Sequence, residues 1–259
     1  MTDRSEYTRY RGVLAYEGTR YQGFQRQAPG IPTIQARVEQ AVEVVTGQHV
    51  TVIGAGRTDA GVHATGQVIC FEMEQTAWKH SAEVLLKALN AQLPDDIALQ
   101  SLRVEQNANF HPRFSASSRM YKYTVLSSAQ RQPLYHQRVW YVPQALDLKK
   151  MQDAAGLLIG EHDFATFGQP PAGINTVRHV FQSEWDVQGD FWCYQVQATA
   201  FLQHMVRRMV GMLVDVGRGR LSVEAFEAHF RAADISKAKT MAPPQGLVLV
   251  AVEYPAQYQ

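Results

Sequence analysis

The chain has 259 residues, 46% of them hydrophobic, and carries 25 Lys and Arg against 24 Asp and Glu, for a formal net charge of +1. This composition excludes an intrinsically disordered chain, because disorder goes with few apolar residues and a high net charge. The near-neutral total also argues against binding of nucleic acid or membrane through bulk charge, so any polyanion must meet a local basic patch. The length favours one large or two modest domains.

The N-terminus, the apolar runs and the cysteines bear on location. Residues 1–6 are polar and mixed in charge and lack the apolar segment of a secretory signal. Apolar runs such as Leu247–Val252 are far shorter than the about 20 residues that a membrane-spanning helix needs. Cys70 and Cys193 lie apart in strand-like segments, so we expect two buried, reduced thiols. These features predict a cytoplasmic protein with no membrane segment.

The first half of the chain alternates predicted strands and helices. Thr33 is a predicted N-cap, and the apolar stripe that follows it ends at Gly47. A second helix begins at Ser81 and ends at Pro94. Runs of β-branched and aromatic residues predict four strands, at Arg9–Tyr16, Val50–Ile53, Val68–Phe71 and Ile97–Val104. The order is β-α-β-β-α-β, the ferredoxin-like or split βαβ arrangement.

The second half repeats this order more loosely. Gly189 lies in the turn tripeptide of a predicted hairpin, and Gly160 closes a predicted helix that carries Leu148, Met151, Ala155 and Leu158. The predicted strands are Tyr121–Leu126, Val139–Val142, Val177–Val187, Phe191–Ala200 and Leu247–Val252. Two further helices are predicted at His204–Val216 and Val223–Ala232. We predict an α+β protein with two ferredoxin-like halves and antiparallel sheets, residues 1–112 and 113–259.

Three long stretches contain no Asp or Glu. They are residues 18–38 with Arg20, Arg26 and Arg37, residues 106–146 with Arg113, Arg119, Lys122, Arg131 and Arg138, and residues 191–214 with Arg207 and Arg208. Aromatic residues are interleaved with the first two sets. Arginines with aromatics suit phosphate contacts and base stacking, as in recognition of unpaired RNA. Half-buried sheet aromatics beside solvated arginines explain the same pattern equally well.

A glycine-rich loop, residues 54–66, lies between two predicted strands. It is not a dinucleotide fingerprint, because Asp59 stands where the third glycine belongs and the loop leads into a strand. No P-loop lysine follows, and the histidines show no paired metal-ligand spacing. Arg57 and Asp59 remain as candidates. Two interpretations stay open: a turn whose Asp caps its own backbone, or a carboxylate held ionised in a cleft by guanidinium groups.

Several motifs accompany this loop in order along the chain. They are Gly56–Ala64 (GRTDAGVHA), Tyr16–Gln27 (YEGTRYQGFQRQ), Phe110–Ala116 (FHPRFSA), Arg119–Tyr123 (RMYKY), Phe201–Arg207 (FLQHMVR) and Gly246–Leu247. The set resembles the tRNA pseudouridine synthase A (TruA) family over nearly the whole chain. The departures are mild: Phe24 stands where Trp is common, Met120 where a basic residue is common, and Gln203 where His is common.

The resemblance implies a reaction and a site. Uridine at positions 38, 39 and 40 of the tRNA anticodon stem-loop would become pseudouridine, with the base detached from C1′, rotated and rejoined through C5. Asp59 would be the nucleophile, with Arg57 and Arg207 as counter-charges. Tyr121 would stack on the target base and Leu247 would pack on the other side of the pocket. Phosphate contacts would come from Arg20, Arg26, Arg113 and Arg119.

The resemblance also implies that no cofactor and no catalytic metal take part. It implies a homodimer in which one tRNA contacts both subunits, and a central RNA-binding cleft between the two halves. Two other functions fit the sequence less well. A non-catalytic RNA-binding module of the same fold should have lost Arg57 or Asp59, and both are present. A metal-dependent phosphodiesterase using Asp59, Asp163 and histidines lacks ligand spacing.

Overall fold

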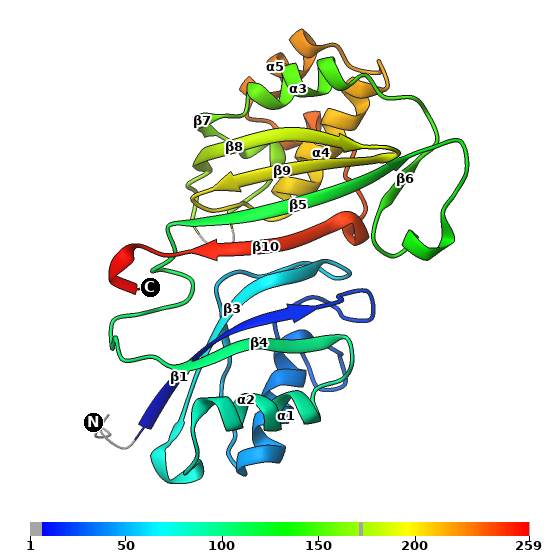
Figure 1. Ribbon diagram of the computed structural model, residues 1–259. Coiled ribbons are helices and arrows are strands. Elements are labelled where there is room, and N and C mark those ends of the chain that lie inside the picture. Colours follow the sequence, from blue (N-terminus) through cyan, green and yellow to red (C-terminus); the bar gives the residue numbers. More distant parts are fainter. Residues whose placement is uncertain (1–6, 171–172, 259) are drawn as a thin grey trace. The chain divides into compact units, whose positions relative to one another are not determined.

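The computed structural model describes residues 7–170 and 173–258 (Figure 1). The protein is a mixed α+β structure with two compact units, Met1–Ser117 with Leu249–Gln259 and Ser118–Val248, here called unit 1 and unit 2. Each is described by itself. The division into 1–112 and 113–259 stays a prediction, and it differs in assigning residues 113–117 and 249–259 to the second part. No helix in the described ranges is both long and apolar enough to span a membrane.

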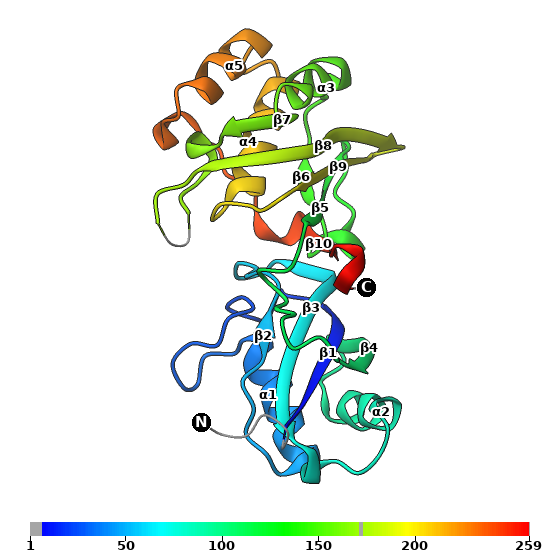
Figure 2. The same cartoon turned by 90° about the vertical axis from the view of Figure 1, so that its left-hand side faces the viewer.

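Unit 1 combines an antiparallel sheet with two helices. Its strands are β1 Tyr7–Tyr16, β2 Ile53–Gly54, β3 His63–Glu74, β4 Ile97–Val104 and the greater part of β10 Leu247–Glu253. The strand order is β4-β1-β3-β10, with β2 also paired to β3, and β1 is antiparallel to both of its neighbours. Helices α1 Ile34–Thr46 and α2 Ala82–Gln92 lie side by side (Figures 1 and 2).

Local hydrogen bonds explain where the two helices begin and end. Thr33 accepts a hydrogen bond from the Ala36 N–H through its side chain, and Ser81 does the same for Val84. These bonds satisfy donors that have no partner within the helix. Gly47 ends α1 in the left-handed region, at φ 74°, and its N–H donates to the Glu43 carbonyl. The caps predicted from the sequence are confirmed.

The sheet of unit 1 is covered on both faces. Alternate residues of β1, among them Tyr10, Leu14 and Tyr16, are buried, and the Tyr10 ring stacks on Phe71 at 5.4 Å between centroids. On the other face an apolar cluster includes Ala55 of the glycine-rich loop; its other buried members are Val68, Cys70, Phe110 and Tyr254. Burial raises the pKa of the Cys70 thiol to about 12. Cys70 and Cys193 are buried and free, as predicted.

Unit 2 has a longer sheet and three helices. Its strands are β5 Ser118–Ser127, β6 Trp140–Val142, β7 Gly160–Asp163, β8 Val177–Gln188, β9 Phe191–Ala198 and the start of β10. The order is β10-β5-β9-β8-β7, with β6 parallel to β5, whereas the β5–β9, β9–β8 and β8–β7 pairs are antiparallel. Helices α3 Leu148–Gly156, α4 Met205–Gly217 and α5 Val223–Arg231 pack against one another.

Two sequence expectations were wrong in detail. The strand predicted at Val50–Ile53 is reduced to β2, because Val50 and Val52 are buried in irregular backbone and the Val52 N–H donates to the Glu39 carboxylate at 3.0 Å. The helix expected to close at Gly160 ends at Gly156 as α3, and Gly160 opens β7, which was not predicted. Leu158 continued the apolar stripe, but it is buried beyond the helix. In both places, apolar side chains that are buried outside regular secondary structure produced a pattern typical of a strand or a helix.

Candidate active site

The glycine-rich loop, residues 54–66, joins β2 to β3 and is tied to the start of the latter strand. The Ala55 N–H donates to the Val68 carbonyl at 2.8 Å, and the Gln67 amide donates to the Gly56 carbonyl at 2.8 Å. Gln67 is fully buried. Because buried polar groups are costly unless they are hydrogen-bonded, this bond holds the entry of the loop in one conformation.

Thr58 anchors the centre of the loop from the position before Asp59. Its side chain is buried and shares a 2.7 Å hydrogen bond with the Tyr16 hydroxyl, at the end of β1. Its carbonyl accepts from the Phe24 N–H at 3.1 Å. Burial raises the pKa of Tyr16 from 10.0 to about 12, so the phenol keeps its proton, and its hydrogen bond with Thr58, into the alkaline range.

The segment Tyr16–Gln27 packs closely against the loop. A Cβ atom at Gly23 would lie 2.7 Å from the Thr58 carbonyl oxygen, and one at Gly18 would lie 2.0 Å from that of Val62. Glycine is required at both positions for the two backbones to approach. The Gly18 N–H also donates to Nδ1 of buried His63 at 3.0 Å. Two motifs far apart in the sequence therefore form one rigid element.

Asp59 and Arg57 lie at the exposed side of this element. The Asp59 carbonyl accepts from the Val62 N–H at 3.1 Å, and Gly61 adopts φ 76°, so the backbone turns sharply after the carboxylate. Asp59 is partly exposed and Arg57 is exposed. Within residues 7–170 and 173–258, Arg57 forms no ion pair, with Asp59 or any other acid. Its guanidinium faces solvent, where a polyanion can reach it.

Unit 2 brings three of its motifs together around α4. The Arg207 Nε donates to the Ala242 carbonyl at 2.8 Å, and the Ala242 N–H donates to the Arg207 carbonyl at 3.0 Å. Gly211 permits this contact, because a Cβ there would lie 2.1 Å from the Thr240 carbonyl oxygen. The Tyr123 hydroxyl donates to the Pro243 carbonyl at 2.7 Å. The guanidinium of Arg207 is thereby fixed in direction relative to β5 and to the segment that leads into β10.

Tyr121 and Leu247 belong to the same part of unit 2. Both are largely buried, and the Tyr121 ring meets Phe201 edge to face at 5.0 Å between centroids. The position before Leu247 requires glycine, because a Cβ atom on Gly246 would lie 2.6 Å from the Tyr123 ring. Phe201 belongs to the motif Phe201–Arg207, but the sequence assigned it no role of its own. His204, where the helix was predicted to begin, is the N-cap of α4 and lies in the left-handed region at φ 62°, a conformation that is uncommon for a non-glycine residue.

The predicted phosphate-binding arginines differ in their surroundings. Arg20 donates to the Asp96 carboxylate at 2.6 and 3.0 Å, and Arg26 donates to Glu39 at 2.8 Å. Arg119 is buried, and its Nη1 donates to the Thr199 carbonyl at 2.8 Å. Arg113 is partly exposed and lies over the Phe114 ring at 5.5 Å from its centroid. Their contacts with substrate stay predictions.

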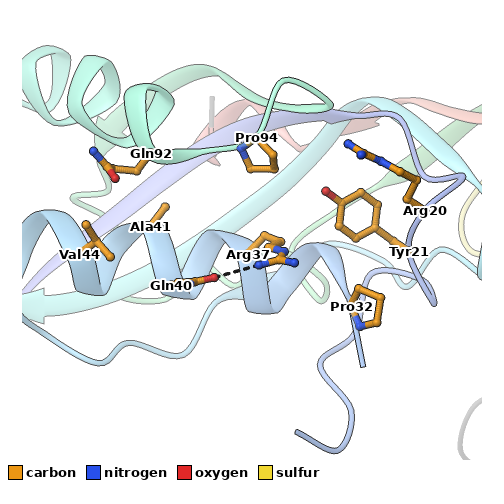
Figure 3. Close-up of a pocket in the computed structure, with 9 residues that line it drawn as sticks. All are labelled: Arg20, Tyr21, Pro32, Arg37, Gln40, Ala41, Val44, Gln92 and Pro94. Atoms are coloured by element: carbon orange, nitrogen blue, oxygen red, sulfur yellow. Dashed lines mark hydrogen bonds between the residues drawn. The ribbon is translucent and has the colours of Figure 1, made fainter. Parts of the chain in front are cut away.

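A pocket of about 530 Å³ lies in unit 1 beside Arg20 and Tyr21 (Figure 3). Helix α1 supplies one wall, including Arg37, whose Nη1 donates to Gln40 at 3.2 Å. The full lining is Arg20, Tyr21, Pro32, Arg37, Gln40, Ala41, Val44, Gln92 and Pro94. It contains two guanidinium groups and no carboxylate. Among the described residues, no cluster of His, Cys, Asp and Glu has the arrangement of a metal site.

Comparisons with known proteins agree with these motifs. The family described as "tRNA pseudouridine synthase" matches residues 13–115 and 154–255, which include Asp59 and Arg207, while Tyr121 lies between the two segments. The chain is 38% identical over 257 residues to the tRNA pseudouridine synthase A of Neisseria gonorrhoeae, covering 99% of this chain and 96% of that one. Proteins of the same name from Shewanella pealeana and Methylacidiphilum infernorum are each 41% identical, over 95% of this chain and 93% and 95% of theirs.

Proposed function

Because the chain belongs to the tRNA pseudouridine synthase A (TruA) family and is an enzyme that isomerises uridine to pseudouridine in tRNA, we propose that it acts at positions 38, 39 and 40 of the anticodon stem-loop with Asp59 as nucleophile. The observation that carries the proposal is the rigid element around Thr58. It holds the Asp59 backbone through hydrogen bonds on both sides while the carboxylate stays partly exposed.

The proposed chemistry needs no external electron, phosphate or hydride. The C1′–N1 bond of uridine breaks, the base turns, and a C1′–C5 bond forms. The C5 proton then leaves and N1 gains one, so the product is an isomer of the substrate. Asp59 either attacks the sugar or stabilises the cleaved ribose. A carboxylate positioned before substrate arrives does this at little cost in reorganisation.

Arg207, Tyr121 and Leu247 complete the proposed site. We assign Arg207 as counter-charge to the carboxylate, supported by the backbone hydrogen bond that orients its guanidinium. Tyr121 stacks on the target base and assists loss of the C5 proton, and Leu247 packs against the base. Arg57 has no carboxylate partner among the described residues, so we assign it to contact RNA. Its positive charge also offsets the charge of the Asp59 carboxylate without forming an ion pair.

Binding must supply the free energy that exposes the target uridine. Flipping a base out of its stack costs a few kcal/mol. Phosphate contacts from Arg113, Arg119, Arg20 and Arg26 would offset that cost and make binding sensitive to salt. Arg20 and Arg26 contribute less, because each already pairs with a carboxylate, and so does Arg119, because it is buried and donates to the Thr199 carbonyl. A homodimer would join two such surfaces on one tRNA. We propose that each subunit has two ferredoxin-like halves; for the first half this is supported by the strand order β4-β1-β3 in unit 1, with β2 on β3.

The central test replaces Asp59. Asp59→Asn should abolish tritium release from tRNA labelled at uridine C5, while tRNA affinity changes less than about threefold because only one charge is lost. Asp95→Asn is the control, since Asp95 is an exposed carboxylate in the same unit. Mass mapping of substrates with a single uridine at 38, 39 or 40 tests the positions. Turnover by Asp59→Asn would overturn the nucleophile, and modification elsewhere would overturn the positions.

A second test separates charge from geometry at Arg207. Arg207→Lys keeps the positive charge but loses the planar, oriented guanidinium, so kcat should fall by about 100-fold with little change in tRNA affinity. Arg208→Lys is a matched control, because Arg208 is the next residue of α4 and is equally half-buried. Equal activity in both variants would remove Arg207 from the proposed site.

A further inference from the structure

The loop before β5, residues 107–117, is ordered by its own hydrogen bonds although it has no regular secondary structure. His111 accepts from the Arg113 and Phe114 N–H groups through Nδ1, at 3.1 and 3.3 Å. The His111 N–H donates to the Ser115 hydroxyl and the Ser115 N–H returns to the His111 carbonyl, both at 3.0 Å. The Tyr254 hydroxyl donates to the Pro112 carbonyl at 2.7 Å. The loop therefore presents its side chains in fixed directions.

Two phenylalanines in this loop have opposite environments. Phe110 is buried, 3% exposed, with Tyr254 at 5.0 Å and the Arg11 guanidinium at 4.2 Å from its ring centroid. Phe114 is 76% exposed. Because most of its side chain is exposed on an ordered loop, the Phe114 ring is accessible to a partner.

The Phe114 ring also packs against two side chains of its own loop. The His111 ring lies 4.4 Å from it between centroids, at an interplanar angle of 32°, and the Arg113 guanidinium lies 5.5 Å from its centroid. Burial, together with the positive charges of Arg113 and Arg9, lowers the pKa of His111. The imidazole that accepts two N–H groups is accordingly neutral at pH 7, and it buttresses the ring without adding charge.

We propose that Phe114 is a stacking platform for one unpaired nucleobase of the substrate tRNA, with Arg113 at the phosphate of the same nucleotide. The inference rests on tRNA as substrate and deepens the proposed function by naming a positioning residue outside the catalytic loop. Stacking on an aromatic ring with an arginine beside it is how proteins bind unpaired nucleotides. The charge next to the ring suits a polyanion, since the Arg113 guanidinium lies 5.5 Å from the centroid of the Phe114 ring. An apolar protein surface would offer no anionic group to the Arg113 guanidinium.

Phe181 in β8 provides a matched control. It is 49% exposed and stacks on His179 at 4.7 Å and 35°, nearly the geometry of the Phe114–His111 pair. Its strand carries the acid Glu184 three residues later. If an exposed ring on a histidine were enough, both phenylalanines would bind RNA. The proposal assigns binding to Phe114 alone.

The experiment measures tRNA binding in an Asp59→Asn background, so that the result does not depend on turnover. Phe114→Ala should raise the Kd for an unmodified tRNA transcript about tenfold, within the range for loss of one base–aromatic stack. Phe114→Trp and Phe114→Tyr should retain affinity, whereas Phe114→Leu, apolar but without a π face, should behave like Phe114→Ala. Binding to a blunt RNA duplex should be unchanged by every variant. Phe181→Ala should bind tRNA like the parent.

Further readouts separate stacking from other roles. Phe114→Ala should leave the salt dependence of the Kd unchanged, while Arg113→Ala should lower its slope by about one. With Asp59 intact, Phe114→Ala should raise KM and leave kcat within about twofold. A Kd within twofold of the parent, or full rescue by Phe114→Leu, would overturn the proposal. A change in oligomeric state in Phe114→Ala would do so too, by assigning the ring to an interface between copies. Turnover by Asp59→Asn would affect the proposed nucleophile only.

Discussion

The acid-free stretches at residues 18–38 and 106–146 look alike in the sequence but differ in the folded protein. In the first, Arg20 and Arg26 pair with carboxylates that lie outside the stretch, Asp96 and Glu39. In the second, Arg131 and Arg138 are exposed and form no ion pair with any residue that the structure describes. A stretch without acids is therefore not by itself a basic surface.

Packing explains the difference. Residues 18–33 fold back onto α1 and onto the turn before β4, and those two elements carry Glu39 and Asp96. Arg131 and Arg138 flank the short 3-10 helix Pro133–Tyr135, where Leu134 is 93% exposed; this segment contacts the start of β9 through Tyr135 and Phe191, at 4.9 Å between ring centroids. Arg20 and Arg26 therefore meet a carboxylate on a neighbouring element, whereas the exposed side chains of Arg131 and Arg138 form no ion pair among the described residues.

The largest effect should come from removing the buried acid of the first stretch. Glu39 is 7% exposed and accepts from Arg26, from the Gln35 amide and from the Val52 N–H, at 2.8, 2.8 and 3.0 Å. Glu39→Ala should lower the free energy of unfolding by about 3 kcal/mol, because buried donors lose their acceptor. Urea titration measures this. Glu43→Ala, at an exposed position of the same helix, should cost below about 0.5 kcal/mol; equal losses would break the comparison.

The second prediction compares the two arginine pairs directly. Arg131→Ala with Arg138→Ala should weaken tRNA binding about tenfold and lower the slope of log Kd against log salt by up to about two, measured between about 50 and 200 mM salt. Arg20→Ala with Arg26→Ala should lower the slope by less than one, since their charges are already paired. If the two double variants behave alike, the ion pairs do not decide which arginines meet RNA.

A smaller effect is expected from freeing Arg20. Asp96→Asn removes the carboxylate that pairs with Arg20 and leaves a hydrogen-bond acceptor for the Tyr21 hydroxyl, which donates to it at 2.7 Å. tRNA affinity at low salt should rise about threefold and the salt slope should steepen by up to one. Asp95→Asn removes the same charge from the neighbouring exposed position and should change affinity less. Equal gains would show that only net charge matters.

The smallest effect appears at alkaline pH. Burial, followed by the hydrogen bond to Asp96 and its charge, raises the pKa of Tyr21 from 10.0 to about 12. Between these values the unfolded chain releases a proton that the folded chain keeps, so this contribution to stability is complete below pH 10 and is lost as the pH rises. In Tyr21→Phe the free energy of unfolding should therefore fall less steeply with pH in this range. The difference in slope should be at most that produced by the release of one proton. An unchanged slope in urea titrations from pH 9 to 11.5 would contradict the shift.

The sequence predicted the features that depend on near neighbours along the chain. The caps at Thr33 and Ser81 and the glycine at the end of α1 form hydrogen bonds within four residues, so their signals are local. The glycine-rich loop and the order of its motifs led to the family. β7 was not predicted because it is short. A strand was wrongly predicted at Val50 and Val52, because their apolar side chains reflect burial and not strand pairing.

What the sequence alone determined is the local framework, the motif that contains Asp59 and the family with its reaction. Only tertiary structure decided which side chains meet: Tyr16 with Thr58 in unit 1, Arg207 with Ala242 in unit 2, and Arg20 and Arg26 with acids outside their stretch. Phe110 and Phe114 make the same point, since one is buried and the other exposed within five residues. The physical reason is that burial and ion pairing depend on contacts between distant segments, whereas caps, turns and periodicity depend on neighbours.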